Sequence, residues 1–242
     1  MKMDLSKISY SKSDLNKNII LPKIINQDLA EEMGLHVGDG SMNVYSNKGL
    51  FQLRGHIIDD KEHYQTRVNE LYEKLYNLKI NIREMKSTGV VGFQIWSDAI
   101  VDFKHKILGL PLGKKGDIQI PEVINNKKLF YSFMRGLFDT DGSLYLENKR
   151  GKPYPRIDIK TTSKPLCLQC LNSLNQYGIR ATSYEYIRKE PNWNNLYSLI
   201  IRGFPALNEW MKYIGSNNSK HIKKFRLVKL YQDNKKSEPA EI

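Results

Sequence analysis

The sequence contains one structural unit twice, and this repetition limits the possible folds more than any other feature. An apolar helical segment ends in Asp-Gly-Ser at 39–41, and a second ends in the same tripeptide at 141–143. The segments after each tripeptide show the same order of hydrophobic patterns. The chain should therefore fold as two similar halves.

Each unit is predicted to run helix, two strands, helix, two strands, helix. Alternating polar and apolar residues predict strand hairpins, and a 3.6-residue period predicts helices. The first unit has hairpins at 41–56, around Asn47-Lys48-Gly49, and at 80–97; the second has them at 143–162 and 179–203. The fold class is thus α+β, with two pseudo-symmetric αββαββα repeats and a four-stranded antiparallel sheet in each.

Between its hairpins, each unit has a helical segment. Tyr64 to Leu78 keep one apolar face in the first unit, and the second helix should begin at Ser163 and stop at Gly178. The predicted parts of the chain are an N-terminal extension at 1–25, a first repeat at 26–115, a linker at 116–128, a second repeat at 129–231 and a disordered tail at 232–242.

The chain is strongly basic. Lys and Arg number 38 against 26 Asp and Glu, a formal net charge of +12, which predicts a polyanionic partner such as nucleic acid or an anionic membrane surface. No apolar run reaches the roughly 20 residues that span a bilayer, and the first residues lack an apolar signal core. An intracellular protein without a membrane segment is expected, in the cytoplasm or in an organelle.

The two cysteines, Cys167 and Cys170, do not predict a zinc site. Such a site needs about four ligands, and no second Cys or His pair lies at a useful spacing. Because both cysteines fall on the apolar positions of a helical pattern, we expect them to be small core residues.

The apolar helices end in an acid, where a helix already carries partial negative charge. Small residues four positions apart, Gly34 with Gly38 and Gly136 with Thr140, would let the two helices pack closely. If they pack about a pseudo-twofold axis, the acids at 39 and 141 emerge together and repel unless a cation lies between them. Magnesium, which prefers carboxylate, water and phosphate oxygens, suits that place.

Two segments, "EMGLHVGDG" at 32–40 and "MRGLFDTDG" at 134–142, resemble the paired motifs of the LAGLIDADG homing endonucleases in their single-chain, two-repeat form. The resemblance covers about 19–231. The first motif departs from the family at Val37, and its unusual His36 is expected to be packed and hydrogen-bonded.

The resemblance implies a saddle-shaped monomer that binds double-stranded DNA. It implies a site-specific, magnesium-dependent endonuclease that cuts both strands at a long, non-palindromic site and leaves staggered ends, with Mn²⁺ or Ca²⁺ able to occupy the site. Asp39 and Asp141 would hold the metal with the backbone carbonyls of Gly38 and Thr140. Aligning Gly109 with Gly215 brings Lys114 onto Lys220, and these lysines would act near the scissile phosphates.

The polar faces of the predicted strands supply candidates for DNA contact. Apolar residues such as Met42, Val44, Leu144 and Leu146 should pack beneath the helices, and the opposite side carries mixed donors and acceptors that can read base edges. The candidates are Asn43, Tyr45, Gln52, Arg54, His56, Arg83, Lys86, Gln94, Tyr145, Glu147, Arg156, Asp158, Lys160, Tyr184, Tyr186 and Arg188.

Other interpretations remain open. The same fold could serve a DNA-binding regulator that does not cleave, or an RNA maturase that assists intron splicing, with intron RNA as a further partner. An intein-borne nuclease is disfavoured because the chain begins with Met and lacks terminal splicing residues. A calcium loop at Asp139 to Glu147 is disfavoured because its glycine comes at position four instead of six.

Overall fold

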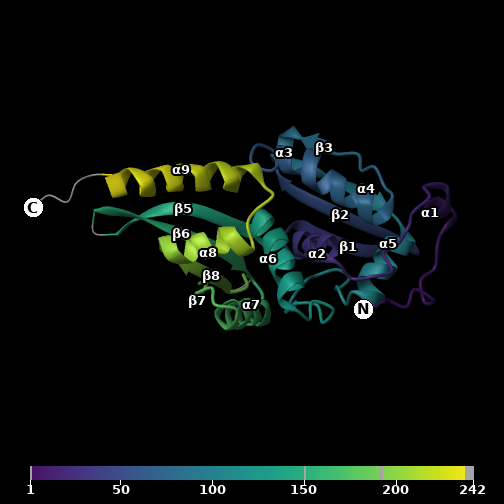
Figure 1. The fold of residues 1–242 in the computed structure, drawn as a ribbon. Helices are drawn as coiled ribbons and strands as arrows, with labels where there is room; N and C mark the ends of the chain where they lie inside the picture. Colours follow the sequence, from purple (N-terminus) through teal and green to yellow (C-terminus); the bar gives the residue numbers. More distant parts are fainter. Residues whose placement is uncertain (1, 150, 191–192, 238–242) are drawn as a thin grey trace, which may run out of the picture.

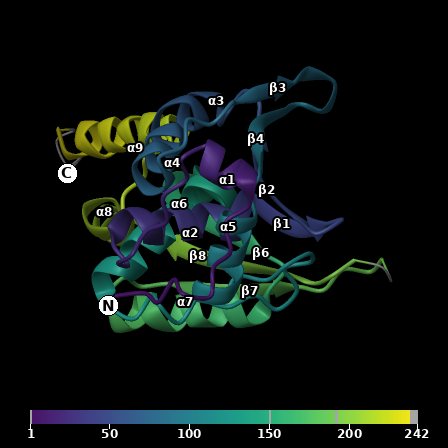
Figure 2. The ribbon, with the colours of Figure 1, turned by 90° about the vertical axis from the view of Figure 1, so that its right-hand side faces the viewer.

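The computed structural model describes residues 2–149, 151–190 and 193–237. The two repeats lie side by side, and a helix of each meets the other at the centre of the molecule (Figure 1). Seen from the side, the strands of both sheets lie toward one face of the molecule, and α8 and α9 lie on the opposite face (Figure 2).

The first repeat follows the predicted order. Its strands form one antiparallel sheet in the order β1-β2-β4-β3. The turn of the first hairpin lies at Ser46 and Asn47, which both have positive φ (47° and 62°), one position before the predicted turn. The elements are α2 (Gln27–Asp39), β1 (Gly40–Tyr45), β2 (Lys48–His56), α3 (Lys61–His63), η1 (Tyr64–Val68), α4 (Asn69–Tyr76), β3 (Arg83–Met85), η2 (Lys86–Thr88), β4 (Val90–Trp96), α5 (Asp98–Asp102) and η3 (Phe103–Ile107).

The second repeat has the same strand order, β5-β6-β8-β7, so the predicted α+β fold with two four-stranded antiparallel sheets is confirmed. Its elements are α6 (Lys127–Asp141), β5 (Gly142–Lys149), β6 (Lys152–Thr161), α7 (Lys164–Gln176), β7 (Thr182–Tyr186), β8 (Leu196–Arg202), α8 (Phe204–Tyr213) and α9 (Ser219–Ser237). Helix α9 continues through 237, where the sequence analysis predicted disorder from 232; residues 238–242 lie outside the described part of the chain.

Helices α2 and α6 form the seam between the repeats, and glycine makes their close approach possible. A Cβ on Gly34 would lie 2.1 Å from the Phe133 carbonyl oxygen, and a Cβ on Gly136 would lie 2.1 Å from the Glu31 carbonyl oxygen. These two contacts are related by the repeat symmetry. Any side chain at either glycine would therefore force the helix backbones apart.

Each seam helix ends at its acid, as predicted, and the next glycine starts a strand. The backbone at Gly40 and Gly142 is extended, so neither residue is required for a left-handed turn. Glycine is needed there because a Cβ would lie within 2.6 Å of the carbonyl oxygen of His36 or Phe138.

A continuous apolar core runs through both repeats. It contains Cys167 and Cys170, which are free and buried, and burial raises the pKa of the Cys167 thiol to about 11. Both cysteines are core residues, as predicted. Val44 and Leu146 differ from the prediction because they are exposed, near the outer ends of their hairpins.

Residues 2–25 wrap around the first repeat and contain α1 (Lys12–Asn16). Met3, Ile19 and Leu21 are buried in the core, and the buried carboxylate of Asp14 accepts from the Ala99 amide at the start of α5. The linker is also bound to the fold, since Ser163 Oγ donates to the Ile118 carbonyl. Among the described helices, none is long and apolar enough to cross a membrane.

Candidate active site

The two acids predicted from the repeated motif converge at the end of the seam. Asp39 and Asp141 are the last residues of α2 and α6. A Cβ on Gly38 would lie 3.4 Å from Asp141 Oδ2, which places the second carboxylate against the last turn of the first helix. Asp39 is half-buried and Asp141 is exposed.

Two further side chains surround Asp39. The buried hydroxyl of Tyr64 donates to Asp39 Oδ2 over 3.1 Å. A Cβ on Gly55 would lie 3.1 Å from Asp39 Oδ2 and 2.9 Å from Asp60 Oδ2, so a third carboxylate lies close by. The repeat motif gives no signal for either residue, because both belong to the segment that follows β2.

The carboxylates of the site repel one another when no cation lies between them. Burial, with the negative charges of Asp141 and Asp60, raises the pKa of Asp39 to about 7. Burial raises the pKa of Asp141 to about 6, against the opposing effect of Lys115 and Lys220. Because Asp141 is exposed to water, which screens its charge, we expect the larger effect at Asp39.

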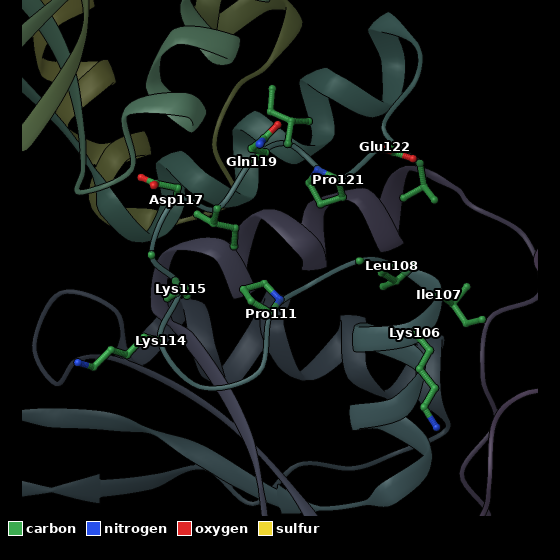
Figure 3. A pocket seen from close by; sticks show the side chains of 15 residues that line it. Lys106, Ile107, Leu108, Pro111, Lys114, Lys115, Asp117, Gln119, Pro121 and Glu122 are labelled. Carbon is green, nitrogen blue, oxygen red and sulfur yellow. The ribbon is translucent and has the colours of Figure 1, made fainter.

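The lysine that the first repeat places at the site is Lys115, and the prediction of Lys114 is corrected. Lys115 Nζ donates to the Val37 carbonyl over 2.8 Å and to the Gly38 carbonyl. Lys114 is exposed and extends in another direction (Figure 3). The Gly113 amide donates to the Met42 carbonyl, which fixes the loop on β1 so that the next two side chains point to opposite sides.

Lys220 of the second repeat also lies beside the carboxylates. Its Nζ donates to Asp60 Oδ1 over 2.7 Å. Its positive charge partly opposes the rise in the pKa of Asp39 and of Asp141. The two lysines differ in position because Lys220 lies in the first turn of α9, whereas Lys115 lies in a loop that leads into the linker. Alignment by glycine spacing could not detect this difference.

Polar groups bind the carbonyl oxygens at the ends of both seam helices. Lys115 serves this purpose on α2, and Asn218 Nδ2 donates to the Asp139 carbonyl on α6 over 2.9 Å. The Gly38 carbonyl, which was predicted to bind the metal, is therefore already bound by the Lys115 ammonium. The Thr140 hydroxyl donates back to the Leu137 carbonyl over 3.0 Å.

His36 is packed as predicted, with its ring stacked on Phe51 at 5.4 Å. The expected hydrogen bond is wrong, because neither ring nitrogen has a partner in the described part of the chain. Burial and the charges of Lys104 and Lys115 hold the pKa of His36 well below its ordinary value. The imidazole is therefore a neutral core ring, at the place that Phe138 fills in the second repeat.

A pocket of about 720 Å³ lies between the loop at 106–115 and the linker at 116–123. Figure 3 shows Lys114 and Lys115 at one end of it. Neither Asp39 nor Asp141 lines this pocket. Asp141 is instead exposed at the surface, and Asp39 is partly exposed.

The first sheet presents its predicted candidates as a continuous polar face. Gln52 pairs with Gln94 in register, and Arg54 and Arg83 lie on either side of Gly92. Because Gly92 has no side chain, the two arginines border a hollow of about 370 Å³. Asn43 and Gln52 are partly buried, whereas Tyr45, Arg54, His56, Arg83, Lys86 and Gln94 are exposed.

The second sheet differs from the prediction because three of its candidates bind one another. Arg156 lies between Glu147 (3.3 Å) and Asp158 (3.1 Å), and Asp158 also accepts from the Ser198 hydroxyl. Asp158 is only 3% exposed, so its prediction as a DNA contact is corrected. Tyr145, Lys160, Tyr184 and Tyr186 are exposed, and Arg188 is partly buried with its guanidinium 4.8 Å from the Trp193 ring centre.

The donor set suits a hard divalent cation. Two carboxylates with raised pKa gain from a nearby positive charge, and oxygen ligands are those that magnesium prefers. Within residues 2–149, 151–190 and 193–237, no three His, Cys, Asp or Glu side chains form a metal cluster. A cation at Asp39 and Asp141 would therefore need further oxygens from water or a phosphate.

Comparison with known proteins agrees with this fold. The family model for a LAGLIDADG-like domain matches residues 131–226, which run from within α6 to within α9 of the second repeat. The structure of I-DmoI in complex with DNA and Mn covers 78% of this chain and 96% of its own, at 18% identity and a TM-score of 0.55. The LAGLIDADG homing endonuclease I-GzeII with its DNA target covers 90% and 94%, at 11% identity and a TM-score of 0.59. The predicted resemblance in fold is confirmed.

Two of the sequence relatives from Methanocaldococcus jannaschii show how much of the chain is shared. A glutamine-fructose-6-phosphate aminotransferase is 26% identical over 209 residues, and a replication factor C small subunit is 30% identical over 210 residues. Each alignment covers 86% of this chain but only 18% and 10% of the relative. The chain thus spans less than a fifth of the length of either protein.

Proposed function

We propose that this chain, which contains a LAGLIDADG-like domain and has the two-repeat fold of the LAGLIDADG homing endonucleases, is a DNA endonuclease that hydrolyses phosphodiester bonds. The observation that carries the proposal is the pair of carboxylates, one from each repeat, at the end of the α2–α6 seam. It would act as a monomer, inside the cell or organelle that contains its target.

Different residues of the site would carry out different parts of the hydrolysis. Asp39 and Asp141 would hold magnesium or another divalent cation, which supplies an activated water and neutralises charge on the scissile phosphate. Lys115 and Lys220 place positive charge beside the carboxylates and would stabilise negative charge that develops on the phosphate. Tyr64 keeps its proton because burial raises its pKa, and it fixes one oxygen of Asp39.

The sheets support recognition of a long duplex. Their polar faces carry arginine, glutamine and tyrosine side chains that can contact base edges and phosphates. The two faces differ in chemistry, since Arg54 and Arg83 are free of carboxylates in the described contacts whereas Arg156 is bound by two. This difference supports a non-palindromic target. That both strands are cut at staggered positions is what the resemblance to the family implies.

The sequence relatives support the homing part of the proposal. Their names describe unrelated activities, yet both share one segment with this chain. A segment that recurs in proteins of unrelated activity is expected of a mobile element. An endonuclease that cuts an allele lacking its own gene would provide such mobility.

Selection of a target followed by cleavage tests the proposal. Sheared genomic DNA that lacks the gene of this protein, and so keeps the target uninterrupted, is selected for binding in Ca²⁺. The bound duplexes are then incubated with Mg²⁺, with Mn²⁺ or without divalent ion. We expect the wild type to cut both strands only with Mg²⁺ or Mn²⁺. Asp39→Asn and Asp141→Asn should bind the same duplexes and cut at least about a hundredfold more slowly.

Two results would contradict the proposal. Cleavage at the wild-type rate by both variants would remove the carboxylates from the reaction. Tight binding without cleavage by the wild type, in either metal, would favour the regulator or maturase instead.

A further inference from the structure

The surroundings of the two carboxylates do not follow the repeat symmetry. Asp60 is the residue before helix α3, and Tyr64 lies one turn later, beside Asp39. The matching positions in the second repeat are Ser163, the residue before α7, and Cys167 one turn later. Ser163 donates to the linker and Cys167 is a core residue, so these two positions bring neither an acid nor a phenol to Asp141.

Asp60 is a buried acid with a full set of partners. Its side chain is 4% exposed. Oδ1 accepts from Lys220 Nζ at 2.7 Å and from Asn218 Nδ2 at 2.8 Å, and Oδ2 accepts from the His56 amide at 2.8 Å. Because the backbone of β2 and the side chain of Asn218 fix this carboxylate, it fixes the ammonium that binds it.

Lys220 reaches across the seam, because the Asp60 carboxylate that holds its ammonium belongs to the other repeat. Lys220 belongs to the second repeat, but it binds Asp60 of the first, whose other oxygen lies with Asp39 Oδ2 at the same point beside Gly55. Conversely, Lys115 of the first repeat binds the carbonyl of Gly38, which lies against the Asp141 carboxylate of the second. Lys115 is held by backbone carbonyls of α2, whereas Lys220 is held by a carboxylate.

We propose that Asp60 is a positioning residue that acts through Lys220 and makes the half of the site at Asp39 different from the half at Asp141. This inference rests on the proposed nuclease function. One scissile phosphate would meet an ammonium oriented by a carboxylate, and the other would meet an ammonium oriented only by neutral carbonyls. The two DNA strands are therefore cut at different rates, and Asp60 sets the rate of one of them.

A strand-resolved cleavage assay tests this inference. The target duplex carries a different fluorophore on each strand, and single-turnover rates are measured in Mg²⁺ for the wild type, Asp60→Asn, Lys220→Met and the double variant. Asp60→Asn should slow one strand by about ten- to a hundredfold, as loss of a supporting partner typically does, and should leave the other within about threefold. Lys220→Met should slow the same strand.

The double variant separates positioning from a merely structural role. If Asp60 acts through Lys220, the double variant cuts that strand no more slowly than Lys220→Met alone. Glu62→Gln is the matched control, since it also removes an acid that pairs with a lysine of α9 (Lys223, 3.1 Å) but lies on the surface. It should not change the ratio of the two strand rates.

Equal slowing of both strands by Asp60→Asn, or additive losses in the double variant, would overturn the inference and leave the nuclease function intact. If Asp60→Asn does not fold, Lys220→Met alone must still slow one strand selectively. A wild type that cuts neither strand would refute the proposed function itself, and this inference with it.

Discussion

Neutralising Asp39 should stabilise the metal-free protein while it abolishes cleavage. The folded pKa of Asp39, about 7, lies above the ordinary 3.8, so the ionised carboxylate destabilises the fold. The cost is absent below pH 3.8, grows as the pH rises toward 7 and is constant above that. At 1.36 kcal/mol per pKa unit, the upper limit is about 4 kcal/mol at pH 8 and about 2 kcal/mol at pH 5.5.

Urea denaturation of the wild type and Asp39→Asn at both pH values, without divalent ions, measures this effect. We expect the variant to be more stable at pH 8, by at most about 4 kcal/mol, and its advantage to shrink by about half at pH 5.5. Asn keeps an acceptor for Tyr64, so the change is mainly one of charge. Saturating magnesium with target DNA should remove the advantage, because the cation stabilises only the wild-type site.

The exposed neighbour of Asp60 supplies a control, since Asp59→Asn removes the same charge from the surface. This control should change the free energy of unfolding by less than about 0.5 kcal/mol. A stability gain for Asp39→Asn that does not depend on pH, or a loss at pH 8, would refute the electrostatic reasoning.

Three further predictions concern the seam and its lysines. Lys115→Met should reduce the cleavage rate at least about tenfold, whereas Lys114→Met should weaken DNA binding slightly and leave the rate constant unchanged, as single-turnover kinetics would show. Gly136→Ala should destabilise the fold by at least about 3 kcal/mol in urea denaturation, because its Cβ would lie 2.1 Å from a backbone oxygen. Lys104→Met should cost about 3 to 5 kcal/mol at pH 8 in the same assay, because it leaves the buried Glu32 carboxylate without its cation.

The repeated motif was sufficient to predict the parts of the site that depend on helix geometry. Two glycines at helical spacing and an acid at the helix end predicted the seam and its carboxylates, and the structure places all of them there. These features are local, since spacing along a helix determines which face a residue occupies.

The residues that the sequence did not predict depend on contacts between distant segments. Lys115 was missed because its position depends on one hydrogen bond, donated by the Gly113 amide to the Met42 carbonyl of β1, in an irregular loop. Asp60 and Tyr64 are more than 20 residues from Asp39 in the sequence and lie beside it only in the folded structure. The pairing of Arg156 with Asp158 did have a signal, because residues two apart on a strand share a face and opposite charges there attract.

The titration of Asp39 tests the central claim that carboxylates from the two repeats share one site. Selective ¹³C labelling of aspartate allows the carboxyl pKa to be followed by NMR in the metal-free wild type and in Asp141→Asn. We predict a pKa of about 7 in the wild type and a lower value in the variant, because the charge of Asp141 is then absent. A pKa near 3.8 that does not change in Asp141→Asn would contradict the account.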